Sequence, residues 1–206
     1  MKAEGAGGTV ARRKTDLILQ QAAQEKIDSH QEVTTEDEDV RTLVRFFLGE
    51  EQYAIDAEYI KSVNEQDQWS RIYPIPCVPR YLLGVINLRS SIISVLDLCD
   101  YFGLPTSEID EFTRIMVVDP ALGKNEEGQL VVGFLVDKVE NIIRVSQDGI
   151  QPALTTIEKV TAEYIEGETH YLDETTEEET LIGIIDVENV LVAEMNSRLG
   201  ETGGTG

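Results

Sequence analysis

The sequence predicts an all-β protein built from small barrels. The main observation is a series of short runs of β-branched and aliphatic residues, each bounded by turn-forming residues. The clearest runs span residues 43–48, 85–88, 92–96, 115–118, 130–136, 141–145 and 181–185. A second observation is that helices do not alternate regularly with these runs, as they would in a doubly wound parallel sheet. Many short strands without that alternation are typical of small barrels.

The first predicted element after residue 41 is a tight hairpin. The residues Gly-Glu-Glu-Gln at 49–52 separate the run 43–48 from the apolar residues 53–55. Further along, Pro74, Pro76 and Pro79 impose an extended path on the chain. The Tyr-Leu-Leu segment at 81–83 then predicts a short helical or turn element that ends at Gly84.

A second hairpin is predicted around Arg89. The apolar run 85–88 precedes this arginine, a turn is expected at Ser90 and Ser91, and a second apolar run begins at Ile92. An arginine at a hairpin tip is either a solvated turn residue or a contact presented to a partner. Most exposed arginines only keep the surface hydrated, so the residue pattern alone leaves both interpretations open.

Two helices interrupt the strands. Asp97 is a suitable N-cap for a short helix over residues 98–102, with Gly103 as the terminating residue. Asp186 is a suitable cap for a longer helix in which Val187, Val190, Leu191 and Leu199 share one face and Gly200 ends the helix.

The composition divides the chain into three parts and limits its partners. Residues 1–40 predict a flexible, partly helical acidic leader, residues 41–199 the folded domain, and residues 200–206 a disordered tail. The 17 Lys+Arg against 39 Asp+Glu give a net charge of 17 − 39 = −22, which excludes nucleic acid and disfavours anionic membranes. No stretch approaches the ~18 apolar residues of a membrane span. We therefore expect a cytoplasmic protein without direct membrane insertion.

No pattern in the sequence marks an enzyme. The only plausible pair of a nucleophilic thiol and a base within the predicted domain is Cys77 with His170, since the other histidine, His30, lies in the predicted leader. Cys77 lies in an apolar Ile-Pro-Cys-Val-Pro segment and Cys99 in the first predicted helix, so both are expected to be small buried hydrophobic residues. Zinc would need about four clustered ligands, and these residues are scattered. We expect neither catalysis nor a metal or cofactor.

Several motifs resemble, in order, those of the CheW family of chemotaxis adaptors, whose domain also occurs in CheV proteins and in the histidine kinase CheA. Residues 84–89 (Gly-Val-Ile-Asn-Leu-Arg) and the following strand 92–98 are the most specific part. The other matching segments are residues 46–56, 75–79, 113–118, 132–139 and 150–152. The resemblance covers roughly residues 41–199, the length of one such domain.

The resemblance implies a fold, a function and a set of interface residues. The implied fold is two intertwined SH3-like barrels of five strands each, with short helices and a C-terminal helix. The implied function is a scaffold, without cofactor, that couples the regulatory domain of CheA to the cytoplasmic tip of methyl-accepting chemoreceptors. Such a protein is associated with the membrane only through receptor arrays. The implied receptor and kinase interface comprises Ile60, Ser62, Gly84, Arg89, Val139 and Ile142.

Arg89 would either fix the register of the partner or brace the hairpin from inside through its rigid guanidinium. Two positions depart from the family pattern. Ser90 replaces a usual glycine, and Ser62 replaces a common acidic residue. A serine at positive φ costs on the order of 1 kcal/mol relative to glycine. These departures keep an alternative open: a specialised CheW-fold protein that binds CheA without receptors, as an assembly inhibitor or as an adaptor in a non-flagellar pathway.

Overall fold

The structure, a computed structural model, describes residues 39–69, 71–106, 108–119, 131–153, 162–172 and 179–192. The predicted leader up to residue 38 and the predicted tail 200–206 lie outside these residues, as do Leu199 and Gly200 of the last predicted helix. Within the described residues, no helix is long and apolar enough to cross a lipid bilayer.

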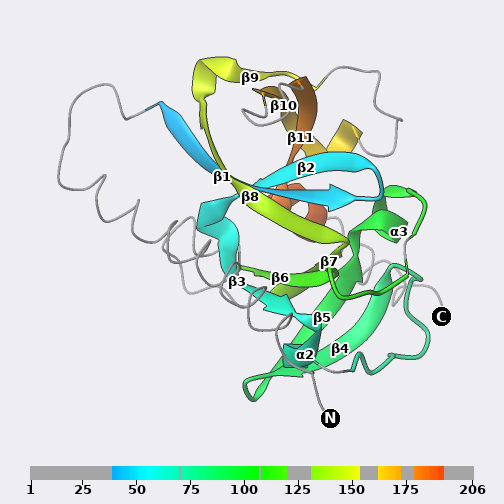
Figure 1. Ribbon diagram of the computed structural model, residues 1–206. Coiled ribbons are helices and arrows are strands. Elements are labelled where there is room, and N and C mark those ends of the chain that lie inside the picture. Colours follow the sequence, from blue (N-terminus) through cyan, green and yellow to red (C-terminus); the bar gives the residue numbers. More distant parts are fainter. Residues whose placement is uncertain are drawn as a thin grey trace, which may run out of the picture.

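The described strands form two sheets, which confirms the all-β prediction (Figure 1). The first sheet has the order β8 (Lys138–Ser146), β1 (Val40–Leu48), β2 (Glu51–Asp56), β11 (Glu179–Ile185), β10 (Ile165–Leu172) and β9 (Ile150–Gln151). The second has the order β3 (Ile60–Glu65), β6 (Arg114–Val118), β7 (Val132–Val136), β5 (Ser91–Asp97) and β4 (Leu82–Leu88). The first sheet has six strands rather than five because the two-residue strand β9 pairs with β10.

The chain passes from the first sheet to the second and back again. Strands β1 and β2 start the first sheet, β3 to β7 form the second, and β8 to β11 complete the first. The return is closed by a parallel pairing between β2 and β11, with Gly183 opposite Tyr53. This crossing ties the two sheets into one unit, as intertwined barrels require.

One hydrophobic cluster joins the two sheets. Phe46 on β1 and Phe134 on β7 are both fully buried in it, at 0% exposure. Two helices add apolar side chains to the same cluster: α3 (Leu98–Phe102) and the helical residues 187–192. The short helices η1 (Ala57–Tyr59), α2 (Gln66–Trp69), η2 (Gln147–Gly149) and η3 (Ala162–Tyr164) connect strands around this core.

The predicted caps of both helices are confirmed. The Asp97 side chain accepts a hydrogen bond from the Asp100 N–H at 3.2 Å, and Gly103 ends α3 with a φ of 72°. The Asp186 carboxylate accepts a hydrogen bond from the Asn189 N–H at 2.9 Å. Both carboxylates thus satisfy a backbone donor that has no partner within its own helix.

The first hairpin is confirmed, and one local prediction is wrong. Leu48 pairs with Glu51, so β1 and β2 are joined by the two residues Gly49 and Glu50. The segment 81–83, predicted as a helical or turn element, instead enters strand β4 at Leu82. Gly84 does not end an element but lies inside the strand, where the register with β5 shifts.

Candidate functional site

The β4–β5 hairpin presents Arg89 at a strained two-residue turn. Leu88 pairs with Ser91, so Arg89 and Ser90 alone form the loop. Both have positive φ, 50° for Arg89 and 71° for Ser90. This is the φ signature of the type I′ turn, which matches the twist of the paired strands and usually contains Asn and Gly. The Asn87 side chain accepts a hydrogen bond from the Ser90 N–H at 3.1 Å, which helps to hold the turn.

Gly84 allows a loop to approach the edge of the second sheet. Its φ is 137°, and a Cβ atom at this position would lie 2.1 Å from the Tyr73 carbonyl oxygen. The Tyr73 N–H donates to the Val85 carbonyl at 2.8 Å, and the Val85 N–H donates to the Tyr73 carbonyl at 2.9 Å. Gly84 is buried, so its predicted place in the interface is filled by the protein's own loop.

Ser62 and Arg89 line one groove on the second sheet. We call it the Arg89 groove. It encloses about 390 Å³. Its described lining residues are Lys61, Ser62, Leu88, Arg89, Ser91, Ile92, Ile93, Val117 and Val131. They come from β3, from β6, from the β4–β5 hairpin and from the residue before β7. The structure therefore brings together two predicted interface residues that are 27 positions apart in the sequence.

The other three predicted residues lie along the junction of the sheets. Ile60 begins β3, while Val139 and Ile142 lie on β8. All three are half-buried and pack against the cluster shared by both sheets. Val139 and Ile142 lie on the strand next to β1, opposite Phe46 and Val44. The predicted interface thus divides into an apolar junction and the Arg89 groove.

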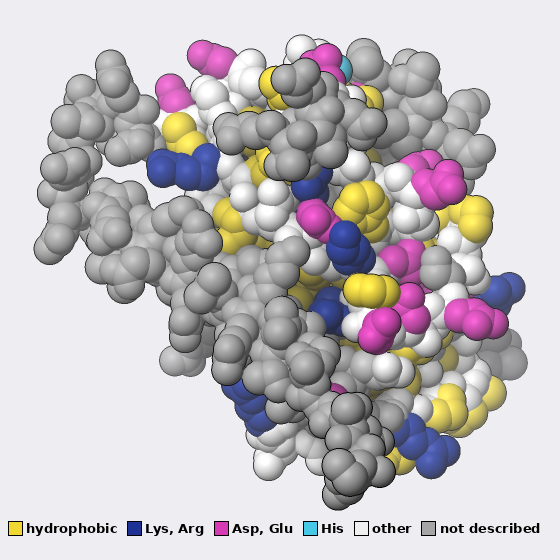
Figure 2. All heavy atoms as spheres, viewed as in Figure 1, with side chains coloured by type: hydrophobic (Ala, Val, Ile, Leu, Met, Phe, Trp, Pro, Cys, Tyr) yellow, Lys and Arg dark blue, Asp and Glu magenta, His cyan; other side chains and the backbone are white. Residues whose placement is uncertain are grey.

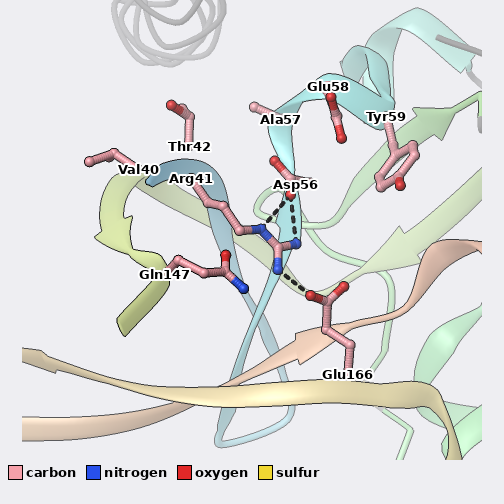
Figure 3. Close-up of a pocket in the computed structure, with 9 residues that line it drawn as sticks. All are labelled: Val40, Arg41, Thr42, Asp56, Ala57, Glu58, Tyr59, Gln147 and Glu166. Atoms are coloured by element: carbon pink, nitrogen blue, oxygen red, sulfur yellow. Dashed lines mark hydrogen bonds and ion pairs between the residues drawn. The ribbon is translucent and has the colours of Figure 1, made fainter. Parts of the chain in front are cut away.

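A second hollow, of about 550 Å³, is organised around Arg41 (Figure 3). The guanidinium of Arg41 donates from Nε to Asp56 Oδ2 at 2.8 Å, lies 2.6 Å from the same oxygen through Nη2, and pairs with Glu166 through Nη1. Burial opposes the charge of Arg41, but Glu166 and Asp56 outweigh that effect and raise its pKa. Asp56 and Glu166 neutralise the charge of Arg41 within the molecule. The three side chains thereby link β1, β2 and β10.

Arg89 is exposed, which favours its interpretation as a presented contact over internal bracing. An arginine that does brace strands from inside is Arg45, only 5% exposed. It donates to Asn141 Oδ1 and to Gln52 Oε1, both at 2.8 Å, and its guanidinium lies 4.4 Å from the centre of the Tyr171 ring. Arg45 therefore links four strands of the first sheet: β1, β2, β8 and β10.

The cysteines differ from each other and from the prediction for Cys77. Cys77 is exposed and has a φ of 59°, so the expectation that it is buried is wrong. In the same Ile-Pro-Cys-Val-Pro loop the apolar Ile75 is also exposed, whereas Val78 is half-buried against the shared core. Cys99 is buried as predicted.

His170 lies 3.2 Å from Glu179 across the β10–β11 pair. Among the described residues, no group of three or more Cys, His, Asp or Glu is arranged to hold a metal ion.

Two groove residues, Lys61 and Ile92, are not among the predicted interface residues. Ile92 is 77% exposed, whereas the adjacent Ile93 is 6% exposed. Both residues belong to one continuous apolar run, so hydrophobicity alone does not reveal which of them faces the core. Strand alternation would separate them only if the register of the turn were known.

A family profile described as "CheW-like domain" matches residues 42–195. The chain belongs to the CheW family. The matched range falls within the predicted domain and includes all six predicted interface residues.

Individual relatives agree with this assignment. The chemotaxis protein CheW of Treponema pallidum is 37% identical over 129 residues, which cover 61% of this chain and 70% of that protein. The chemotaxis protein CheW of Bacillus subtilis is 30% identical over 149 residues, covering 72% and 85%. The crystal structure of scaffolding protein TtCheW from Thermoanaerobacter tengcongensis superposes with a TM-score of 0.58 and 30% identity, covering 71% of this chain and 89% of that one. The chain accordingly shares its family with proteins named chemotaxis protein CheW and its fold with a structure named as a scaffolding protein.

Proposed function

We propose that this protein is a cytoplasmic CheW-type adaptor that couples the regulatory domain of CheA to the cytoplasmic tip of chemoreceptors. The observation that carries the proposal is the division of the predicted interface into two surfaces of different chemistry. An apolar junction suits the packing of a helical receptor tip. A groove with charged and apolar walls suits a second, separate contact. An adaptor needs two such surfaces because it must hold two partners at once.

The apolar junction is supported by the burial of its members. Ile60, Val139 and Ile142 each expose part of an aliphatic side chain while the rest packs on the rigid shared core. Side chains anchored in this way lose little further entropy when a partner covers them. Covering their exposed aliphatic parts would remove apolar surface from water, which favours association.

A second candidate function is favoured by Ser62 and Ser90. Both differ from the residues that the resemblance leads us to expect, Ser62 in the Arg89 groove and Ser90 in the turn beside Arg89. If these two positions contact the receptor, the chain keeps one partner and loses the other. In that case it is a specialised CheW-fold protein that binds CheA without receptors. The change Ser90→Gly would then restore receptor binding, and an unchanged affinity would count against this function.

The experiment that tests both functions is a pulldown with the regulatory domain of the cognate CheA, alone and with receptor-containing membranes. The native protein is compared with Arg89→Ala and with Arg80→Ala, a matched control in which an arginine outside the groove, with an 85% exposed side chain, is removed. The adaptor function is supported if the native protein binds both partners and only Arg89→Ala loses binding to one of them. Binding to CheA alone supports the specialised protein. Binding to neither partner overturns both.

A further inference from the structure

The connection between α3 and β6 exposes two large apolar side chains. We call its residues 108–113 the Phe112 loop. Ile109 is 44% exposed and Phe112 is 52% exposed. Neither is among the described members of the three hydrophobic clusters. An aromatic side chain held in water forgoes the free energy that its burial would release, so its exposure needs a structural cause.

The cause is a hydrogen-bond network that fixes the backbone of the Phe112 loop. Asp110 Oδ1 accepts hydrogen bonds from the Phe112 N–H at 2.8 Å and from the Thr113 N–H at 3.0 Å. The Thr113 hydroxyl oxygen accepts one from the Asp110 N–H at 2.9 Å. The buried guanidinium of Arg114 donates to the Glu111 carbonyl at 2.7 Å and to the Thr113 carbonyl at 3.0 Å. The backbone is thus held on both sides of Phe112, and the aromatic ring is presented outward on a fixed loop.

The Phe112 loop is also acidic. The exposed residues Glu108, Asp110 and Glu111 flank the two apolar side chains of Ile109 and Phe112. Figure 2 shows acidic side chains lying beside hydrophobic ones on the described part of the face in view. Such a surface is complementary to a segment that carries cations next to aliphatic side chains.

One segment of this chain has that composition. Arg12, Arg13 and Lys14 are the only neighbouring cations in the sequence, and the aliphatic run Leu-Ile-Leu at 17–19 follows two residues later. Residues 12–19 lie outside the described residues, which begin at residue 39. The intervening chain can extend over about 70 Å, whereas a folded domain of this size is roughly 40 Å across. The segment can therefore reach the Phe112 loop from the start of β1.

We propose that residues 12–19 of the chain itself dock on the Phe112 loop. The aliphatic run packs on Ile109 and Phe112, and the cations pair with Glu108 and Glu111. The tether keeps the segment at an effective concentration in the millimolar range, so weak contacts suffice to hold it. The docked segment shields Phe112 from contact with other proteins. The inference is independent of the adaptor function, because no residue of the Phe112 loop lines the Arg89 groove or is among the predicted interface residues.

The first measurement compares NMR spectra of the isotope-labelled full chain and of two leader variants. The double change Arg12→Glu and Arg13→Glu should shift the amide signals of residues 111–113, because reversed charges are repelled by the acidic loop. The matched control, Lys2→Glu with Lys26→Glu, reverses the same number of charges elsewhere in the leader and should leave these signals in place. High ionic strength should move the native signals towards those of the first variant.

A charge exchange tests the pairing of the two segments. Amide exchange at residues 17–19 should be about tenfold slower in the native chain than in the variant with Arg12→Glu and Arg13→Glu, or in a variant with Glu108→Arg and Glu111→Arg. The chain that combines all four changes should regain the protection, because the charges are again opposite. A merely structural effect of either pair on the loop or on the leader would not be rescued in this way.

The apolar half of the contact is tested by Phe112→Ser. Loss of the aromatic anchor should remove about tenfold of the protection at residues 17–19. The side chain is exposed, and the N–H of residue 112 still donates to Asp110, so the variant keeps the fold. The control Ile75→Ser removes an exposed apolar side chain from a different loop and should leave the protection unchanged.

The proposal is overturned if the loop signals ignore the leader variants or if Phe112→Ser leaves the protection intact. It is also overturned if the leader variants shift only another exposed apolar pair, Leu172 and Leu181 on β10 and β11. Shifts that grow with protein concentration would assign the docked segment to a second copy, which would equally overturn docking within one chain.

Discussion

The carbonyl oxygen of Tyr73 occupies the space where a side chain at position 84 would begin. A Cβ atom on Gly84 would lie 2.1 Å from that oxygen, closer than any non-bonded contact permits. Tyr73 and Val85 exchange two backbone hydrogen bonds at the same place. The loop before β4 therefore pairs with the edge strand of the second sheet, and it covers backbone groups that would otherwise be open to pairing with another chain.

The substitution Gly84→Ala is expected to lower the free energy of unfolding by about 3 kcal/mol, because the loop and its two hydrogen bonds must move away. Gly49→Ala is the matched control. Gly49 also has a positive φ, of 60°, but its Cβ would meet nothing within 4 Å, so we expect a cost of about 1 kcal/mol. Urea unfolding of both variants measures the difference. Equal losses would show that backbone conformation, rather than contact with Tyr73, determines the requirement for glycine.

The turn residue Ser90 predicts a stabilising substitution. Its φ of 71° is strained for serine and accessible to glycine. Ser90→Gly should raise the free energy of unfolding by about 0.5–1 kcal/mol after the extra freedom of glycine in the unfolded chain is subtracted. For a domain of this size, the corresponding rise in Tm is about 2–4 °C per kcal/mol. Thermal unfolding of the Ser90→Gly variant measures this rise in Tm. The control is Ser146→Gly, which should destabilise the protein because Ser146 has an unstrained φ of −65°.

The sequence predicts local elements well because their causes are local. The hairpin at Gly49 and the caps at Asp97 and Asp186 follow from turn residues and side-chain acceptors only a few positions away. The runs of β-branched residues fall on strands for the same reason. The number of sheets and their sharing of strands, by contrast, enter only through the family resemblance, because the β2–β11 pairing joins residues more than 120 positions apart.

The candidate site is less predictable because it depends on which faces the fold covers. Nothing local distinguishes Ile92, which is exposed, from Ile93, which is buried. The prediction that Cys77 is buried is wrong for a related reason. An apolar Pro-rich segment is as compatible with an exposed loop as with a core strand. The resemblance supplies Ser62 and Arg89, but only the structure places them in one groove with Lys61.

The two cysteines should react at very different rates. Cys77 is exposed and Cys99 is buried, and burial together with the carboxylates of Asp137 and Asp97 raises the pKa of the Cys99 thiol to about 12. Because the thiolate is the reactive form, an aromatic disulfide reagent should modify one thiol rapidly in the native protein and the second only after unfolding.

The variant Cys77→Ser assigns the rapid reaction. It should abolish the fast phase and leave the slow one, while Cys99→Ser should have the opposite effect. A fast phase that survives Cys77→Ser would mean that α3 opens often enough to expose Cys99, and the rate of that phase would measure the opening.

The cap residue Asp97 predicts a pH-dependent difference between two variants. Burial raises the pKa of its carboxyl group, although the N–H groups of Asp100 and Cys99 oppose this. The folded state therefore binds this proton more tightly than the unfolded state does. The contribution of Asp97 to stability is greatest at acid pH and is lost as the pH rises through the folded pKa.

Asp97→Asn keeps the hydrogen-bond acceptor of the cap and removes the buried charge, whereas Asp97→Ala removes both. At neutral pH the Asn variant should be at least as stable as the native protein, and the Ala variant should lose about 1 kcal/mol. As the pH falls towards the ordinary pKa of aspartate, about 4, the native carboxyl becomes protonated and any advantage of the Asn variant should disappear. Urea unfolding of the native protein and the two variants, from neutral pH down to about pH 4, measures these differences in stability. An advantage that grows on acidification would mean that the cap hydrogen bonds, and not burial, control the ionisation of Asp97.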